Sequence, residues 1–205
     1  MEIDFSQIGA PARYKLLVGL VFPRPIALVY TSGETGVANC APFSFFNAVC
    51  EDPPLLMVSY APLADGSLKH SLINSLNSGS FAVNLVDEGI ASAMHVSSGD
   101  FPAEVSEFAE TGLTPAPCHL IPHPRVAEAP VCFECRVFRV VEFAPNRQII
   151  FGKVVYMHVR DGIVDPRNYR VVDTDYRPVG RIFGKRYCTS RQRFEMPGAV
   201  PDFPG

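Results

Sequence analysis

The sequence predicts a mainly β protein in which antiparallel strands form a barrel carrying a few short helices. Three observations lead to this prediction: strand-like runs are frequent, hairpin turns join them, and only one segment has a convincing helical pattern. The runs are rich in Val, Ile, Phe and Tyr and are bounded by Gly, Pro, Asn or Asp. They span residues 26–31, 37–41, 55–60, 81–86, 131–143 and 148–159.

The connections between these runs favour antiparallel pairing. The first two runs are joined by Ser32–Gly36, whose two glycines can adopt positive φ angles in a hairpin. The last two are joined by Ala144–Arg147, a Pro- and Asn-containing turn that predicts a longer hairpin. Strands and helices do not alternate regularly, which argues against a parallel nucleotide-binding sheet.

One helix is expected over residues 67–78, because Leu68, Leu72, Ile73 and Leu76 fall on one face. Asp65 or Ser67 can cap its start, and Gly79 can close its end. Shorter helices are expected near residues 89–96 and 103–111. Five prolines and two histidines between positions 115 and 130 predict a loop there.

Composition limits the class of protein. At 205 residues the chain is expected to be one domain, residues 1–205, with residues 173–205 forming a tail that packs on the barrel or on a partner subunit. A hydrophobic content of 47% and a mean hydropathy of +0.13 indicate a folded globule. A net charge of -3 argues against nucleic-acid binding. No apolar run approaches the roughly 20 residues of a membrane span, and no secretory signal begins the chain, so we expect a cytoplasmic protein.

The six cysteines are too sparse for a disulfide scaffold. Cys132 and Cys135 have CxxC spacing, but they fall within a predicted strand, where residues three apart face opposite sides. A second ligand pair at zinc-site spacing is lacking. We therefore expect one core and one surface cysteine and no metal site. The histidines at positions 95, 119, 123 and 158 show no paired spacing, so no catalytic residue is assigned.

The segment Asn39–Asn47 combines polar side chains with three phenylalanines. Asn39 and Ser44 offer hydrogen-bonding groups, and Pro42 is expected to interrupt strand pairing and free backbone groups. Such groups suit a flat heteroaromatic ring held between apolar walls. Composition alone favours the simpler interpretation that these are core phenylalanines beside a capped strand end.

The start of the predicted helix suits a phosphate, because its first N–H groups are unpaired and Lys69 and Ser71 lie nearby. Arg24, between two prolines, is a second candidate. The alternatives are a solvated lysine, a neutral helix serine and an exposed arginine.

Several blocks occur in the order found in one known family. Residues 24–29 (Arg-Pro-Ile-Ala-Leu-Val), the segment 39–49, Asp52-Pro53-Pro54, Lys69-His70-Ser71 with Asn74, and residues 79–86 resemble the flavin reductase-like family of FMN-binding split-barrel proteins. The resemblance is strong over residues 20–90 and looser at residues 178–181 and Tyr187. It implies a split β-barrel and a homodimer with FMN near the subunit interface.

The resemblance also implies roles for particular residues. Asn39, Cys40 and Ala41 would meet the isoalloxazine ring, and Ser44, Phe45 and Phe46 would line the ring and the ribityl chain. The phosphate would be held by Lys69 and Ser71, with Ser59 nearby and Arg24 a less certain contributor, while Arg181 and Tyr187 would close over the flavin. Two positions depart from the family pattern: His70 stands where an acidic residue is usual, and Cys40 where a leucine is usual.

The function expected from this resemblance is an FMN-dependent oxidoreductase that passes electrons from NADH or NADPH to flavin or a small acceptor. Hydride transfer is the cofactor's chemistry, which explains why no catalytic triad or carboxylate pair stands out. One alternative is an FMN-holding electron carrier or flavin store without nicotinamide turnover. Another is a β-barrel binding module that holds no flavin.

Overall fold

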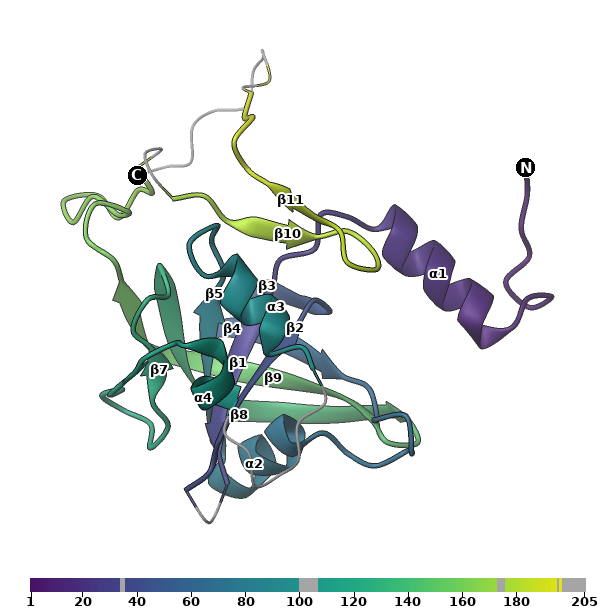
Figure 1. The fold of residues 1–205 in the computed structure, drawn as a ribbon, viewed down its shortest axis with the longest axis horizontal. Helices are drawn as coiled ribbons and strands as arrows, with labels where there is room; N and C mark the ends of the chain where they lie inside the picture. Colours follow the sequence, from purple (N-terminus) through teal and green to yellow (C-terminus); the bar gives the residue numbers. More distant parts are fainter. Residues whose placement is uncertain (34–35, 100–106, 173–175, 195, 197–205) are drawn as a thin grey trace.

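The computed structural model describes residues 1–33, 36–99, 107–172, 176–194 and 196. The chain folds as a mainly β protein, and the predicted antiparallel split barrel is confirmed (Figure 1). Its main sheet has seven strands in the order β2-β1-β5-β8-β9-β4-β3. These strands are β1 (Ala27–Ser32), β2 (Ala38–Phe43), β3 (Phe46–Glu51), β4 (Pro54–Tyr60), β5 (Ser80–Leu85), β8 (Val131–Ala144) and β9 (Arg147–Val159).

All strand pairs in this sheet are antiparallel, as expected. Both predicted hairpins form: β1 pairs with β2 so that Ala27 lies opposite Phe43, and β8 pairs with β9 from Val131 opposite Val159. The turn after β8 contains Asn146, whose φ of 57° is tolerated by asparagine better than by most residues.

The sheet curls until its two ends meet around a buried core. Phe43 at the end of β2 packs against Tyr60 at the end of β4, with ring centroids 4.7 Å apart. This aromatic pair joins a cluster inside the barrel that includes Val29, Val58 and Ile150. A second cluster lies on the other face of the sheet, under the α3 and α4 helices. Both faces of the central strands are therefore buried.

The predicted helix is present as α2 (His70–Ser78), but it begins three residues later than expected. Neither Asp65 nor Ser67 caps it. The Asp65 carboxylate instead accepts bonds from the Ser67 N–H (2.9 Å) and hydroxyl (2.6 Å), forming a turn before the helix. Lys69 occupies the N-cap position, and Gly79 ends the helix in the left-handed conformation, as expected.

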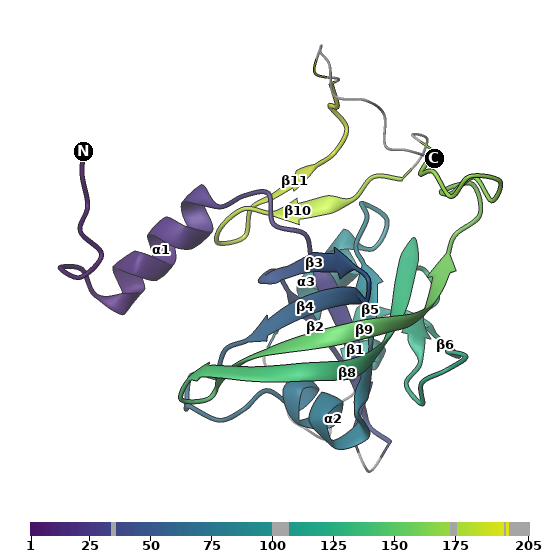
Figure 2. The same ribbon diagram turned by 180° about the vertical axis from the view of Figure 1, so that it is seen from behind.

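The α1 helix (Ala10–Leu20) was not predicted from the sequence, because it has no apolar stripe. It extends away from the barrel, so only Val18 is buried, while Tyr14, Leu17 and Leu20 are exposed (Figures 1 and 2). The expected short helices are α3 (Ala91–Val96) and α4 (Glu107–Thr111). The start of the second expectation, residues 103–106, lies outside the described residues.

Two local predictions are wrong. Pro42 does not interrupt pairing: β2 continues through it to Phe43, and Pro42 lies opposite Leu28. The strand tolerates proline because β2 is an edge strand. Residues 115–130 are not entirely loop, since β6 (Pro115–Ala116) and β7 (Arg125–Val126) form a short ladder.

The two cysteines of the CxxC sequence face opposite sides of β8, as predicted, but neither is on the surface. Cys132 belongs to the outer cluster and Cys135 to the cluster inside the barrel. The expectation of one surface cysteine fails because both faces of the sheet are covered at this point. All six cysteines have free thiols.

Two strands near the C-terminus, β10 (Val179–Arg181) and β11 (Tyr187–Thr189), form a hairpin that lies beside the segment leading into β1. Arg24 and Arg181 exchange two backbone hydrogen bonds, of 3.0 and 2.8 Å. Within the described residues, every helix is too short or too polar to cross a bilayer.

His123 fixes the connection between β6 and β7 to the barrel. Its side chain is buried, with Nδ1 accepting the Ser32 N–H at 3.0 Å and Nε2 2.9 Å from the Ser78 hydroxyl. Burial lowers the pKa of this histidine below its ordinary value of 6.5. The folded protein therefore holds the ring neutral in conditions where the unfolded chain binds a proton.

We predict that the free energy of unfolding decreases as the pH falls below about 6.5, because the unfolded state then binds more protons than the folded state. Urea titrations from about pH 8 to about pH 5 will measure this slope. His123→Gln should have a shallower slope, and His119→Gln, which changes an exposed histidine, should retain that of the wild type. Equal slopes in all three proteins would contradict the assignment to His123.

Candidate functional site

A cavity of about 380 Å³ opens between the β2 strand and the start of α2, and we call it the first cavity. The alternation of β2 turns Asn39, Ala41 and Phe43 to this side. The opposite wall contains Lys69, His70 and Ser71, and the end of α3 contributes residues 97–99. The full lining is Asn39, Ala41, Pro42, Phe43, Leu63, Ala64, Asp65, Lys69, His70, Ser71, Ser97, Ser98 and Gly99.

The α2 end of the first cavity favours an anion. The first N–H groups of a helix have no partner within the helix and carry partial positive charge. The Lys69 side chain adds a cation beside them, and the Ser71 residue is buried against the cavity wall. Asp65 also lines the cavity, but its carboxylate is bound to Ser67, and these bonds lower the Asp65 pKa.

A second cavity, of about 150 Å³, adjoins the first and shares Pro42, Phe43 and Ser98 with it. It lies between α1, the start of β1 and the C-terminal hairpin. Its other lining residues are Tyr14, Val18, Arg24, Ile26, Ser44, Met94, Arg181, Phe183 and Tyr187. We call the two adjoining cavities together the depression; the first has Lys69 at its α2 end, and the second has aromatic rings beside Arg24 and Arg181.

The Arg24 side chain forms hydrogen bonds with three segments around the second cavity. Its buried guanidinium donates to the carbonyl of Val18 (2.7 Å), and to those of Val21 and Ile182. The Nε group lies 3.5 Å from the Ser44 hydroxyl. Burial, the largest influence, lowers the Arg24 pKa from its very high ordinary value. The charge is thus bound to the protein's own backbone.

Tyr187 carries the most connected hydroxyl in the second cavity. It bonds to His95 Nδ1 at 3.0 Å and accepts a hydrogen bond from Arg181 Nη1. The Arg181 guanidinium also lies 4.7 Å from the centre of the Tyr187 ring and donates to the Gly184 carbonyl. Tyr187 and Arg181 therefore present a phenol and a cation to the second cavity, and His95 supports the phenol through its hydrogen bond.

The residues expected from the sequence fall into three sets. The first cavity brings together Asn39, Ala41, Lys69 and Ser71, and the second brings together Arg24, Ser44, Arg181 and Tyr187. Four others line neither cavity. Cys40 is buried in the outer cluster, Phe46 is buried inside the barrel, Phe45 is exposed, and the Ser59 N–H donates to the Phe45 carbonyl. Their roles toward a flavin stay predictions.

Several residues in or behind the cavity walls have no signal in the sequence. His95, dismissed for lacking a paired partner, bonds to a tyrosine 92 positions away. The end of the short α3 helix is the one sequence feature near Ser97, Ser98 and Gly99, and it does not indicate a cavity. Such contacts arise from the fold and leave no spacing signal.

Comparison with known proteins defines the family. A model of the flavin reductase like domain matches residues 19–180, so the chain belongs to the flavin reductase-like family. The fold and the order of the sequence blocks agree with this membership. An uncharacterised protein of Aquifex aeolicus is 41% identical over 187 residues, covering 91% of this chain and 94% of the relative.

Two solved structures resemble the chain over almost its whole length. The 2-nitrobenzoate 2-nitroreductase NbaA of Pseudomonas fluorescens is 34% identical, with a TM-score of 0.88, and the match covers 100% of this chain and 98% of that one. Nitrilotriacetate monooxygenase component B of Bacillus cereus is 31% identical, with a TM-score of 0.89, over 96% and 98% of the two chains. The expected family is therefore confirmed.

We predict that Arg24→Met lowers the free energy of unfolding by about 2–4 kcal/mol, because hydrogen bonds to a charged group are lost and buried carbonyls are left unpaired. Chemical denaturation will measure the change. Arg139→Met, which alters an exposed arginine of β8, is the matched control and should lose little. If the two variants are equally stable, the hydrogen bonds of the Arg24 guanidinium are not a major source of stability.

Proposed function

We propose that the protein is an FMN-dependent oxidoreductase that takes electrons from NADH or NADPH and passes them to flavin or a small acceptor. The single observation that carries the proposal is the pair of adjoining cavities, one ending at a helix N-terminus with Lys69 and the other lined by aromatic and cationic side chains. Membership of the flavin reductase-like family supports it. So does the nitroreductase name of a relative 34% identical in sequence.

The donor set of the first cavity fits FMN. A phosphate needs N–H donors and a cation, which the start of α2, Lys69 and Ser71 supply. The ring system needs an apolar wall and polar groups at its edge, and Phe43, Ala41 and Asn39 provide these on one face of β2. His70 lines the same end of the cavity.

The chemistry of accepting a hydride and releasing electrons is supplied by FMN when it is bound. The protein's part is to hold FMN, to orient it and to shield it from solvent. In this proposal the second cavity admits the donor or acceptor, and Arg181 and Tyr187 orient it. The Tyr187 hydroxyl in that cavity wall bonds to His95 Nδ1, and this bond orients the phenol.

An FMN-holding electron carrier or flavin store is the second candidate. It would use the first cavity in the same way but would not admit a nicotinamide. The small volume of the second cavity, about 150 Å³ in this chain, favours this alternative, because pockets for drug-sized ligands are typically about 300 Å³ or larger.

We also propose that the protein acts as a homodimer. The α1 helix leaves Leu17, Leu20 and Tyr14 exposed on an arm that extends from the barrel (Figure 2). Large apolar side chains exposed on such an arm favour contact with a second subunit.

We predict that Lys69→Met weakens FMN binding by about ten- to a hundredfold, since a hydrogen bond to a charged group contributes about 1.5–3 kcal/mol. Fluorescence titration of the flavin-free protein with FMN will measure the affinity. Lys153→Met removes a positive charge from an exposed position on β9 and serves as the control. Equal affinities for the two variants would place the phosphate elsewhere.

We predict that anaerobic addition of NADH or NADPH bleaches the visible absorption of the bound flavin. Tyr187→Phe should retain FMN but slow this reduction at least about tenfold, because an oriented donor is lost from the second cavity. Stopped-flow absorbance will measure both rates. A flavin-loaded protein that neither nicotinamide reduces would support the electron carrier instead.

A further inference from the structure

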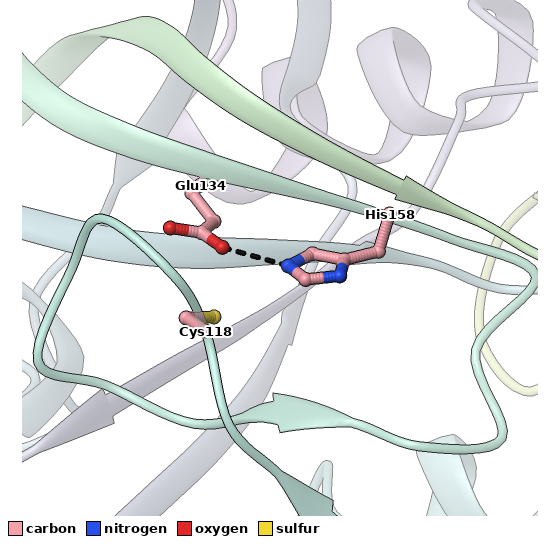
Figure 3. A group of neighbouring side chains, drawn as sticks. All are labelled: Cys118, Glu134 and His158. Carbon is pink, nitrogen blue, oxygen red and sulfur yellow. Dashed lines mark hydrogen bonds and ion pairs between the residues drawn. The ribbon is translucent and has the colours of Figure 1, made fainter.

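Three side chains with metal-binding atoms gather on the outer face of the sheet, and none of them lines either of the two cavities. They are Cys118, Glu134 and His158, and their ligand atoms all lie within 4.8 Å of one another (Figure 3). Glu134 Oε1 and His158 Nε2 are 2.7 Å apart. The three residues come from the β6–β7 connection, β8 and β9, so no sequence spacing indicated them.

The sheet register explains how these residues meet. Cys132 lies directly opposite His158, and Glu134 is two residues further along β8 on the same face. Glu134 and His158 are therefore diagonal neighbours across the β8–β9 ladder. The connection containing Cys118 crosses this face, and the N–H groups of His119 and Leu120 donate to the Glu134 carboxylate at 2.7 and 2.6 Å.

Glu134 is a buried carboxylate held by two backbone N–H groups and one side chain. The residue has 0% exposure, and His158 is its one ion-pair partner in the part of the chain that the structure describes. The Cys118 thiol lies beside this pair, so the cluster brings together a carboxylate, an imidazole and a thiol. This donor set suits a divalent cation.

We propose that Cys118, Glu134 and His158 bind one Zn²⁺ ion. Thiolate, imidazole and carboxylate together favour zinc over magnesium or calcium, which prefer oxygen ligands. Tetrahedral zinc places its ligand atoms about 3.3–3.6 Å apart, so shifts of about 1 Å complete the site. The ion takes the place of the hydrogen bond between Glu134 and His158, and the backbone bonds to the carboxylate remain as outer support.

The fourth ligand is water. His158 also lines a cavity of about 490 Å³ with Arg125, Tyr156 and Arg160, which gives the ion and a water molecule a path to the site. Binding there fixes the connection between β6 and β7 to the sheet. The same connection carries His123, so zinc links this segment to the barrel at a second point.

The test is zinc binding by the full-length protein after removal of metal with a chelator, measured by isothermal titration calorimetry. We expect one ion per chain for the wild type. Cys118→Ser and His158→Gln should each weaken binding at least about a hundredfold, since loss of even a supporting group costs about 10–100-fold. Cys50→Ser, an exposed cysteine on β3, is the matched control and should bind as the wild type does.

Thermal unfolding provides the second readout. Zinc should raise the melting temperature of the wild type and of Cys50→Ser but not of Cys118→Ser, because a ligand stabilises only the state that binds it. Cys118 is only half-buried, so its serine variant is expected to fold even if Glu134→Gln does not. The proposal is overturned if the wild type binds no zinc, or if Cys118→Ser and His158→Gln keep the wild-type affinity.

Discussion

The contact between Phe43 and Tyr60 closes the barrel where its edges meet, and both cavities lie beside it. The two rings join β2, at one edge of the seven-stranded sheet, to β4 near the other edge. Here the barrel is closed by side-chain packing and not by a continuous ladder of hydrogen bonds. Phe43 also lines both cavities, so the depression lies along this seam. The split barrel thus has both cavities where its edges meet.

The strands were predictable because their physical signals are local. Apolar β-branched runs and turn residues located β8 and β9 to within one or two residues. The α1 helix was not predictable in this way, since a helix that leaves the barrel buries only Val18 and needs no apolar stripe. The start of α2 was misjudged because Asp65 bonds to Ser67 in a preceding turn, which leaves Lys69 at the N-cap.

The candidate site was predictable in part. The resemblance drew attention to Asn39, Ala41, Lys69 and Ser71, and these residues do line one cavity. Contacts between distant segments were not predictable, because a sequence does not indicate which loops the fold brings together. Two such contacts are the hydrogen bond between His95 and Tyr187 and the hydrogen bond from Arg24 to the Ile182 carbonyl. Glu134 was similarly overlooked as a polar residue inside a CxxC sequence.

Arg24 and Glu134 show how one fold uses two buried charges. Arg24 donates to three backbone carbonyls, two at the end of α1 and one after β10, and Glu134 accepts from backbone amides on the outer face. A charge satisfied by backbone groups is costly to redirect, since moving it would leave those groups buried and unpaired. Arg24 is therefore poorly suited to capture a phosphate, and the cationic end of the first cavity rests on Lys69 and the start of α2. Glu134 differs because its partner His158 is a side chain that can turn toward a metal ion, while the amides that hold the carboxylate stay in place.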